Sequence, residues 1–363
     1  MSDDLAAARA LLPGVQLDAL DELRGGERSV VHRVRATAPD GTRSTLVVKR
    51  FLAAGEGWVR ESAALSVLPS AVRAARVVAA SAAPPVLITD DLGAGGSVAD
   101  ALLGNDPALA GDAVVGWAQA IATLHVATRA SRDVFRAALA ERQGDLPVGE
   151  SRMSVDLDDA VRVLDRECGS LGVRVPAGAF DELRGLGKRL GGSGAAALTP
   201  ADTCPDNNVA TATGLALIDF EGAQWRHIAW DVAYLLVPWP TCWCSWRIPD
   251  GVAERALAAY RGIAAKGFPE LADAGFDADV EAAVVGWALL STSWFIDNAL
   301  GSDPQLNPDK PTPTRRAMIL HRLDRAARSV EVPALAELAG AIAGELRQRW
   351  GDVPLAYAPA FAQ

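Results

Sequence analysis

The chain has 363 residues, of which 50% are hydrophobic and 22% charged, and its formal net charge is -10. This composition is typical of a folded protein of about two domains and argues against wholesale disorder. It also argues against a nucleic-acid partner, which requires a basic face. No segment has the roughly 20 uncharged apolar residues of a bilayer span, and the acidic N-terminus does not resemble a signal peptide. We therefore expect a cytoplasmic protein without a membrane partner, while the oligomeric state stays open.

Strands and one short helix are predicted for the first ninety residues. Residues 30–38 and 44–51 are rich in β-branched side chains and flank a Gly-containing turn, so they should form an antiparallel hairpin. Further elements are a strand at 15–23, a helix at 60–68 and a strand from residue 84 that runs into acids and glycines.

The rest of the chain is mainly helical by its apolar periodicity. Predicted helices cover residues 112–130, 252–265, 280–300, 315–330 and 333–350. The sequence thus predicts an α+β fold with two lobes: a small antiparallel β N-lobe, residues 1–92, and a large helical C-lobe, residues 93–363.

The four cysteines are Cys168, Cys204, Cys242 and Cys244. A zinc site typically pairs two C-x-x-C units, and TCWC supplies only C-x-C. We therefore expect reduced, structural thiols.

Three polar residues in the middle of the chain are spaced like a phosphoryl-transfer site. Asp202 and Asn207 are five residues apart in TPADTCPDNN, and Asp219 follows in LALIDFEGA. Two short apolar strands joined by Thr213-Gly214 separate Asn207 from Asp219, and a hairpin would bring these two side by side. An amide oxygen and a carboxylate can hold Mg²⁺, and the second carboxylate can accept a hydroxyl proton. The alternative is that these residues only cap loops.

Lys49 lies in the apolar strand VVKRF, where an unpaired charge is unfavourable. Glu61, taken to open the following helix, is its expected partner, and Glu56 is an alternative. A strand lysine held by a helix glutamate is the arrangement that contacts ATP phosphates in kinases.

Taken in order, VVKRF, RESAALSVLP, LITDDLG, IATLH, ADTCPDNN, LALIDFEGA and WDVAYLL resemble the aminoglycoside phosphotransferase and choline kinase-like family over nearly the whole chain. The resemblance implies a protein-kinase-like fold and ATP as phosphate donor, with GTP as an alternative. Lys49 would contact the phosphates and Glu61 would orient it. Thr89 and Asp91 would offer backbone groups to the adenine, and Ser29 of the loop GGERSVVHRV would contact the nucleotide.

The same resemblance implies that Asp202 is the catalytic base and that Asn207 and Asp219 bind Mg²⁺. Asp231 matches the family's buried acid that braces the catalytic loop. The family usually reads His-Gly-Asp where this chain has Pro200-Ala201-Asp202. The missing histidine is a hydrogen-bonding brace, so its loss concerns loop geometry and rate more than the reaction class.

The implied function is transfer of phosphate to a hydroxyl of a small molecule: an aminoglycoside-like or other antibiotic, which would make it a resistance enzyme, a sugar, a nucleoside or an amino alcohol. The family reads its acceptor with acids of the C-lobe, which makes Glu221 and Asp297 candidates for substrate contact. The alternative is a pseudokinase that binds nucleotide without efficient turnover.

Overall fold

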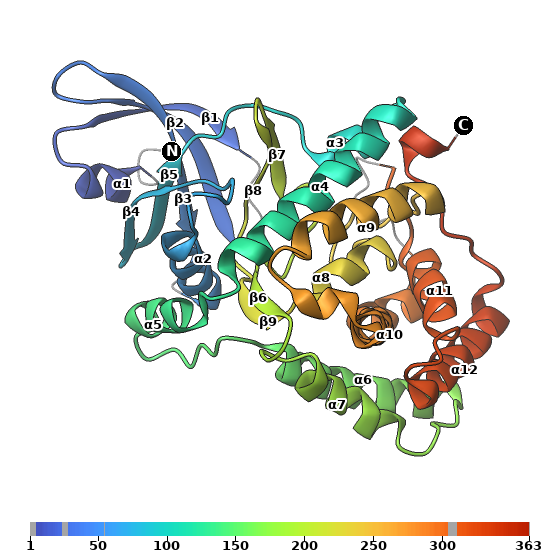
Figure 1. The fold of residues 1–363 in the computed structure, drawn as a ribbon. Helices are drawn as coiled ribbons and strands as arrows, with labels where there is room; N and C mark the ends of the chain where they lie inside the picture. The colour runs from blue at the N-terminus through green and yellow to red at the C-terminus, as the bar shows by residue number, and fades with distance from the viewer. Residues whose placement is uncertain (1–4, 24–27, 54, 304–310, 363) are drawn as a thin grey trace.

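The structure, a computed structural model, describes residues 5–23, 28–53, 55–303 and 311–362. Figure 1 shows a twisted sheet in the N-terminal part of the chain, set against a larger group of helices formed by the remainder. The two-lobed α+β fold predicted from the sequence is confirmed.

The N-lobe is a five-stranded antiparallel sheet with the strand order β1-β2-β3-β5-β4. The predicted hairpin forms, with Val31 opposite Lys49 in β2 and β3. The elements are α1 (Ala6–Leu11), β1 (Gln16–Leu23), β2 (Ser29–Thr37), β3 (Arg43–Phe51), α2 (Glu56–Val67), β4 (Val77–Ala82) and β5 (Pro85–Asp90).

The helix α2 begins four residues earlier than the sequence predicts. Gly55 ends the preceding extended segment, and Trp58 and Val59 are buried, so the first turn already packs against the core. The expectation that Glu61 opens this helix is therefore wrong. Glu61 lies more than one turn inside α2, and its buried side chain faces the sheet from there.

The C-lobe is built around α10, which is buried along most of its length and contacts α6, α8 and α11, while α4 and α9 pack against each other (Figure 1). All five predicted helices are present, whereas α5, α6 and α7 were not predicted. The elements are α3 (Val98–Leu103), α4 (Pro107–Thr128), α5 (Arg132–Arg142), α6 (Met153–Leu171), α7 (Ala179–Arg189), α8 (Ala229–Val232), η1 (Ala233–Leu235), α9 (Asp250–Ala264), η2 (Pro269–Ala272), α10 (Ala274–Gly301), α11 (Arg315–Ala326), α12 (Pro333–Trp350) and η3 (Pro359–Phe361).

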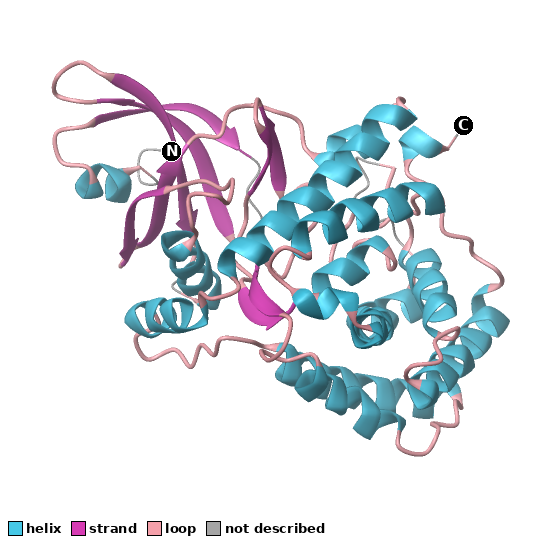
Figure 2. Ribbon diagram, viewed as in Figure 1, coloured by secondary structure: helices cyan, strands magenta, loops and turns pink. Residues whose placement is uncertain are grey.

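Two short strand pairs lie between the lobes and carry the loops of interest (Figure 2). The strand β6 (Ala196–Thr199) pairs with β9 (Gln224–His227), and β7 (Asn208–Thr211) pairs with β8 (Gly214–Leu217). The β7–β8 pair is the hairpin expected from the sequence. Residues 200–207 and 218–223 are the two loops that connect the pairs.

The lobes are joined by residues 91–97, between the end of β5 and the start of α3. The division of the chain after residue 92 stays a prediction. Among the described helices, none combines the length and the apolar character that crossing a bilayer would require.

Candidate active site

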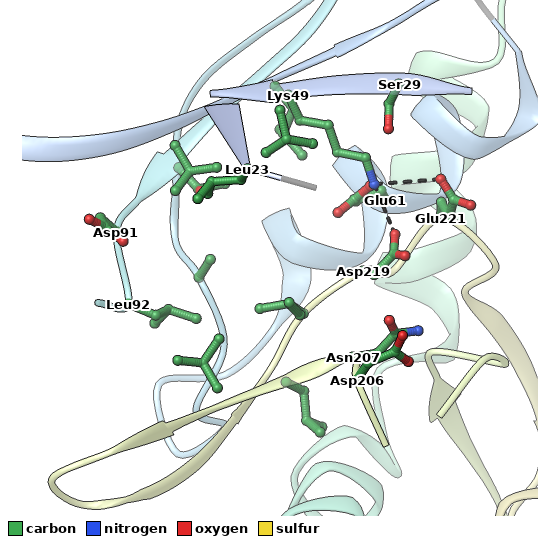
Figure 3. Close-up of a pocket in the computed structure, with 18 of the residues that line it drawn as sticks. Leu23, Ser29, Lys49, Glu61, Asp91, Leu92, Asp206, Asn207, Asp219 and Glu221 are labelled. Atoms are coloured by element: carbon green, nitrogen blue, oxygen red, sulfur yellow. Dashed lines mark hydrogen bonds and ion pairs between the residues drawn. The ribbon is translucent and has the colours of Figure 1, made fainter. Parts of the chain in front are cut away.

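A cleft of about 750 Å³ lies between the lobes and has an apolar part and a charged part. Apolar side chains of the N-lobe sheet face others from the β7–β8 hairpin across the cleft; they include Leu23, Val47 and Leu87 above, and Leu217 and Ile218 below. Figure 3 shows Leu23, Asp91 and Leu92 at one end and Lys49 with several carboxylates at the other. An apolar slot that ends in charged groups suits a flat ring with a polar tail.

Lys49 on β3 is the centre of the charged part. Its Nζ lies 2.7 Å from Glu61 Oε2, 2.8 Å from Asp219 Oδ1 and 3.5 Å from Glu221 Oε2. Glu56, the alternative partner, instead pairs with Arg60 at 2.6 Å and also contacts Arg152. The structure thus brings Lys49 and Glu61 together, as the sequence predicts.

Three carboxylates around one ammonium leave this cluster with excess negative charge. Burial alone would lower the pKa of Lys49, but the carboxylates of Glu61, Asp219 and Glu221 raise it above its usual value. Burial raises the pKa of Glu61 to about 7, opposed by the attraction of Lys49. The carboxylate oxygens of these three acids lie within 4.8 Å of one another, which suits a bound cation.

Asn207 and Asp219 face each other across the open end of the β7–β8 hairpin. The backbone N–H of Ile218 donates to Asn207 O at 3.1 Å, which fixes the register at this end. The Asn207 side chain donates through Nδ2 to Asp202 O at 2.9 Å, so its amide oxygen remains for a ligand. Asp219 adopts a left-handed backbone, with φ of 62°, a strained conformation that often marks functional sites.

Asp202 is not among the residues that line the cleft. Its Oδ1 accepts hydrogen bonds from Thr241 Oγ1 at 2.6 Å and from Cys204 Sγ at 3.0 Å. Burial raises the pKa of Asp202 to about 6, although these two hydrogen bonds act in the opposite direction. A carboxylate with this pKa is ionised at neutral pH and can accept a proton.

The loop that carries Asp202 is held by backbone contacts at Ala201. The carbonyl oxygen of Ala201 accepts from Tyr234 Oη at 3.0 Å and from Arg226 Nη2 at 3.3 Å. Ala201 has a φ of 65°, which glycine, the residue usual here in the family, adopts without strain. The loop is therefore braced in the absence of a histidine at Pro200.

The buried carboxylate of Asp231 holds Arg226, one of the two donors to Ala201 O. It pairs with Arg226 and accepts from His125 Nε2 at 3.0 Å. Burial alone would raise the pKa of Asp231, but the Arg226 charge and the His125 hydrogen bond hold it below its usual range. Asp231 thus lies where a buried acid beside the catalytic loop was expected, and it contacts that loop through Arg226.

The three other nucleotide-contact candidates line the cleft. Thr89 and Ser29 are buried, and the Asp91 carboxylate accepts from Arg33 Nε at 2.8 Å. Gly25 and Gly26 of the expected phosphate loop, with Glu27, lie outside the described residues.

The two acceptor candidates lie in different surroundings. Glu221 is close to Lys49 and pairs with Arg28 at 2.5 Å, so it belongs to the charged part of the cleft. Asp297 is exposed on α10, pairs with Arg166 at 2.8 Å and does not line the cleft. Their roles in acceptor binding stay predictions.

Sequence reasoning missed several groups that complete the site: Arg28, Asp206, Arg226, Tyr234 and Thr241. Asp206 lines the cleft and is adjacent to Asn207, so its position could have drawn attention to it. Arg28 lies in GGERSVVHRV and Tyr234 in WDVAYLL, two motifs that drew attention to other residues. Arg226 and Thr241 reach the site through folding, and no local motif marks them.

Comparison with known proteins shows the family to which this chain belongs. The model of the phosphotransferase enzyme family matches residues 22–273, more than half of the chain. No curated protein matches this chain. Among solved structures, an ethanolamine kinase from Plasmodium vivax superposes with a TM-score of 0.51 and 13% identity, over 94% of this chain and 86% of that chain.

Two further solved structures are similar at lower TM-scores. A choline/ethanolamine kinase family protein from Mesorhizobium loti has a TM-score of 0.49 and 17% identity, covering 93% of this chain and 99% of that chain. A macrolide 2'-phosphotransferase from Brachybacterium faecium has a TM-score of 0.49 and 14% identity, covering 90% and 98%. The family match confirms the resemblance seen in the sequence, and this chain belongs to the phosphotransferase enzyme family.

Proposed function

We propose that the chain transfers the terminal phosphoryl group of ATP to a hydroxyl of a small molecule, with Mg²⁺ as cofactor. The observation that carries this proposal is the convergence of Glu61, Asp219 and Glu221 on Lys49 at the charged end of the cleft. A phosphoryl-transfer site needs such a group to position phosphates.

The chain's own residues would divide the binding of the nucleotide between the two parts of the cleft. The apolar part would hold the base, with backbone groups of Thr89 and Asp91 at its edge and Ser29 near the phosphates. Lys49 would contact phosphate oxygens, and Glu61 would hold its ammonium in place. Because the transition state is loose, this positioning contributes much of the rate.

The excess negative charge near Lys49 and the remaining amide oxygen of Asn207 fit a hard divalent cation. Asn207 and Asp219 would hold Mg²⁺, which supplies positive charge to offset the phosphate oxygens during transfer. Asp202 would orient the acceptor hydroxyl and accept its proton. The acceptor would be an antibiotic, a sugar, a nucleoside or an amino alcohol.

Nucleotide binding and turnover together test this proposal. Calorimetric titration with ATP or GTP should show binding that strengthens when Mg²⁺ is present, and Asp219→Ala should lose that dependence. Wild-type protein should hydrolyse ATP slowly, and Asp202→Ala should lower this rate by about 10²-fold or more, as expected for a lost general base. Cys168→Ser, a buried change on α6, is the control and should keep both properties.

Two other outcomes would contradict the proposal in different ways. Mg²⁺-dependent binding with no hydrolysis and no transfer would identify a pseudokinase. If the protein binds neither ATP nor GTP, the cleft is not a nucleotide site and the proposed phosphotransferase function is wrong.

A further inference from the structure

Three of the four cysteines gather beside the loop that carries Asp202. Cys204 belongs to this loop, and Cys242 and Cys244 come from the segment after η1. All three are buried, and the Sγ atoms of Cys242 and Cys244 are 2.7 Å apart. Cys204 Sγ, Cys242 Sγ and a carboxylate oxygen of Asp206 lie within 4.8 Å of one another. The fold thus assembles a cluster that the C-x-C spacing alone did not predict.

The carboxylate of Asp206 is already turned toward the sulfurs. Its Oδ2 accepts from Trp243 Nε1 at 2.6 Å, and its Oδ1 lies 3.7 Å from Cys242 Sγ. Two ligands of one tetrahedral zinc ion are about 3.5–3.8 Å apart, given Zn–S and Zn–O bonds of about 2.3 and 2.1 Å. A donor that fixes one carboxylate oxygen while the other faces the site is typical of the outer contacts of metal ligands.

A buried arginine supplies an independent observation. Arg322 on α11 is 1% exposed, and its Nη1 has no hydrogen-bond partner among the described residues. Its Nη2 donates to Ser245 Oγ at 2.9 Å. Burial lowers the pKa of Arg322 to about 10, so the guanidinium stays charged at neutral pH; the groups whose charge acts on it are Tyr234, Cys242 and Cys204. A buried cation needs an anion nearby, and thiolates would provide one.

The geometry points to a binding site for a thiophilic divalent cation such as Zn²⁺, formed by Cys204, Asp206 and Cys242, with Cys244 adjacent. Binding releases the two thiol protons, including the one through which Cys204 Sγ donates to Asp202 Oδ1, and forms two metal–sulfur bonds and one metal–oxygen bond. Two thiolates and a carboxylate on a divalent ion carry one net negative charge, which Arg322 balances. The site is distinct from the proposed Mg²⁺ site, whose ligands are all oxygen atoms.

A disulfide within this cluster explains fewer of the observations. It would use two sulfurs, leave the orientation of Asp206 without a role and, being neutral, leave Arg322 without an anion. An occupied metal site accounts for both features. It would also connect the catalytic loop to the segment that carries Thr241, whose hydroxyl bonds to Asp202.

The test uses the full chain, reduced with a phosphine and kept in excess Mg²⁺ so that oxygen-ligand sites are filled. Equilibrium dialysis against Zn²⁺ should give one ion per chain for wild type and for Cys168→Ser. Cys204→Ser and Cys242→Ser should each bind at least about tenfold more weakly, the usual effect of losing a metal contact. Asp206→Asn, which keeps every thiol, should also weaken binding. Circular dichroism and thermal unfolding verify that the variants are folded.

Co²⁺ gives a readout that needs no substitution. Wild-type protein with Co²⁺ should show the intense near-ultraviolet band of cobalt–thiolate charge transfer, and Zn²⁺ should abolish it. Any one of three results would overturn the proposed site. They are the lack of that band, the lack of stoichiometric Zn²⁺ uptake by wild type, and full Zn²⁺ uptake by both serine variants. So would a Cys204–Cys242 disulfide formed with mild hydrogen peroxide in protein that takes up no Zn²⁺. None of these readouts depends on ATP, so they stand apart from the test of the phosphotransferase.

Discussion

Burial and hydrogen bonding act in opposite directions on the pKa of the Asp202 carboxylate. Burial raises its pKa to about 6, and hydrogen bonds from Thr241 and Cys204 lower it from what burial alone would give. A base acts in its deprotonated form, so activity should rise with pH through this value and level off above it.

Substitution of Thr241 tests this balance. Thr241→Val removes a hydrogen bond to the ionised form, so the pKa of Asp202 should rise and the acid limb of kcat/KM should move to higher pH. Thr241→Ser keeps a hydroxyl and should leave the limb near its wild-type position. The measurement is kcat/KM against pH for the three proteins, since this ratio reports the free enzyme. An unmoved limb in Thr241→Val, or a shift to lower pH, would argue against Asp202 as the titrating base.

At the scale of elements, the catalytic loop is held without the family's histidine. Tyr234 and Arg226 both donate to Ala201 O, and Asn207 donates to Asp202 O. These contacts connect the loop to η1, β9 and the start of the β7–β8 hairpin.

This bracing predicts that restoring the histidine gains little. Pro200→His should change kcat by less than about tenfold, the equivalent of one ordinary hydrogen bond. Tyr234→Phe, which removes one of the existing donors, should lower kcat with a smaller change in KM. Steady-state kinetics of both variants checks this. A gain in Pro200→His well beyond tenfold would mean that the proline leaves the loop poorly held.

The buried pair of Asp231 and Arg226 should be important for stability. Asp231→Asn leaves Arg226 buried without an anion, and we expect a loss of about 3–5 kcal/mol in the free energy of unfolding. The matched control is Asp277→Asn, which breaks a largely exposed pair with Arg261 and should lose no more than about 1 kcal/mol. Urea unfolding measures both.

The pH dependence of that loss has a definite sign. The folded pKa of Asp231 lies below its ordinary value of 3.8. Its stabilising effect is therefore complete above that value and decreases as the pH falls through the lower folded pKa. The difference between wild type and Asp231→Asn should shrink in acid. A difference that stays constant would contradict the ionic role of Asp231.

At the scale of the whole molecule, many helices and strands could be predicted from local sequence patterns. The β-branched runs around Lys49 predicted β2 and β3, and Thr213-Gly214 between two apolar runs predicted the β7–β8 hairpin. These elements place Lys49 on β3 and set Asn207 and Asp219 side by side, while contacts between the lobes, such as the Leu217 N–H that donates to Arg73 O, bring all three to one cleft. The apolar repeat of residues 112–130 likewise predicted α4, and the apolar run at 280–300 predicted α10, whereas the amphipathic helix α6 was not predicted.

The rest depended on contacts between distant segments. The helix α2 begins directly after Gly55, whereas the sequence pattern predicted a start at Arg60. Glu61 was therefore expected at the start of the helix, although it lies inside it. Thr241 reaches Asp202 across 39 residues, and Cys204 and Cys242 meet across 38. No local spacing encodes such pairs, because they arise only when the C-lobe packs.

Transfer of phosphate to an acceptor is the central claim, and one measurement tests it most directly. The full chain is incubated with ATP and Mg²⁺ against antibiotics, sugars, nucleosides and amino alcohols, and the products are read by mass spectrometry. We predict that one acceptor class gains the mass of a single phosphoryl group, and that the product disappears in Asp202→Ala. Gain of a whole nucleotidyl group, or an unchanged yield in Asp202→Ala, would contradict the mechanism.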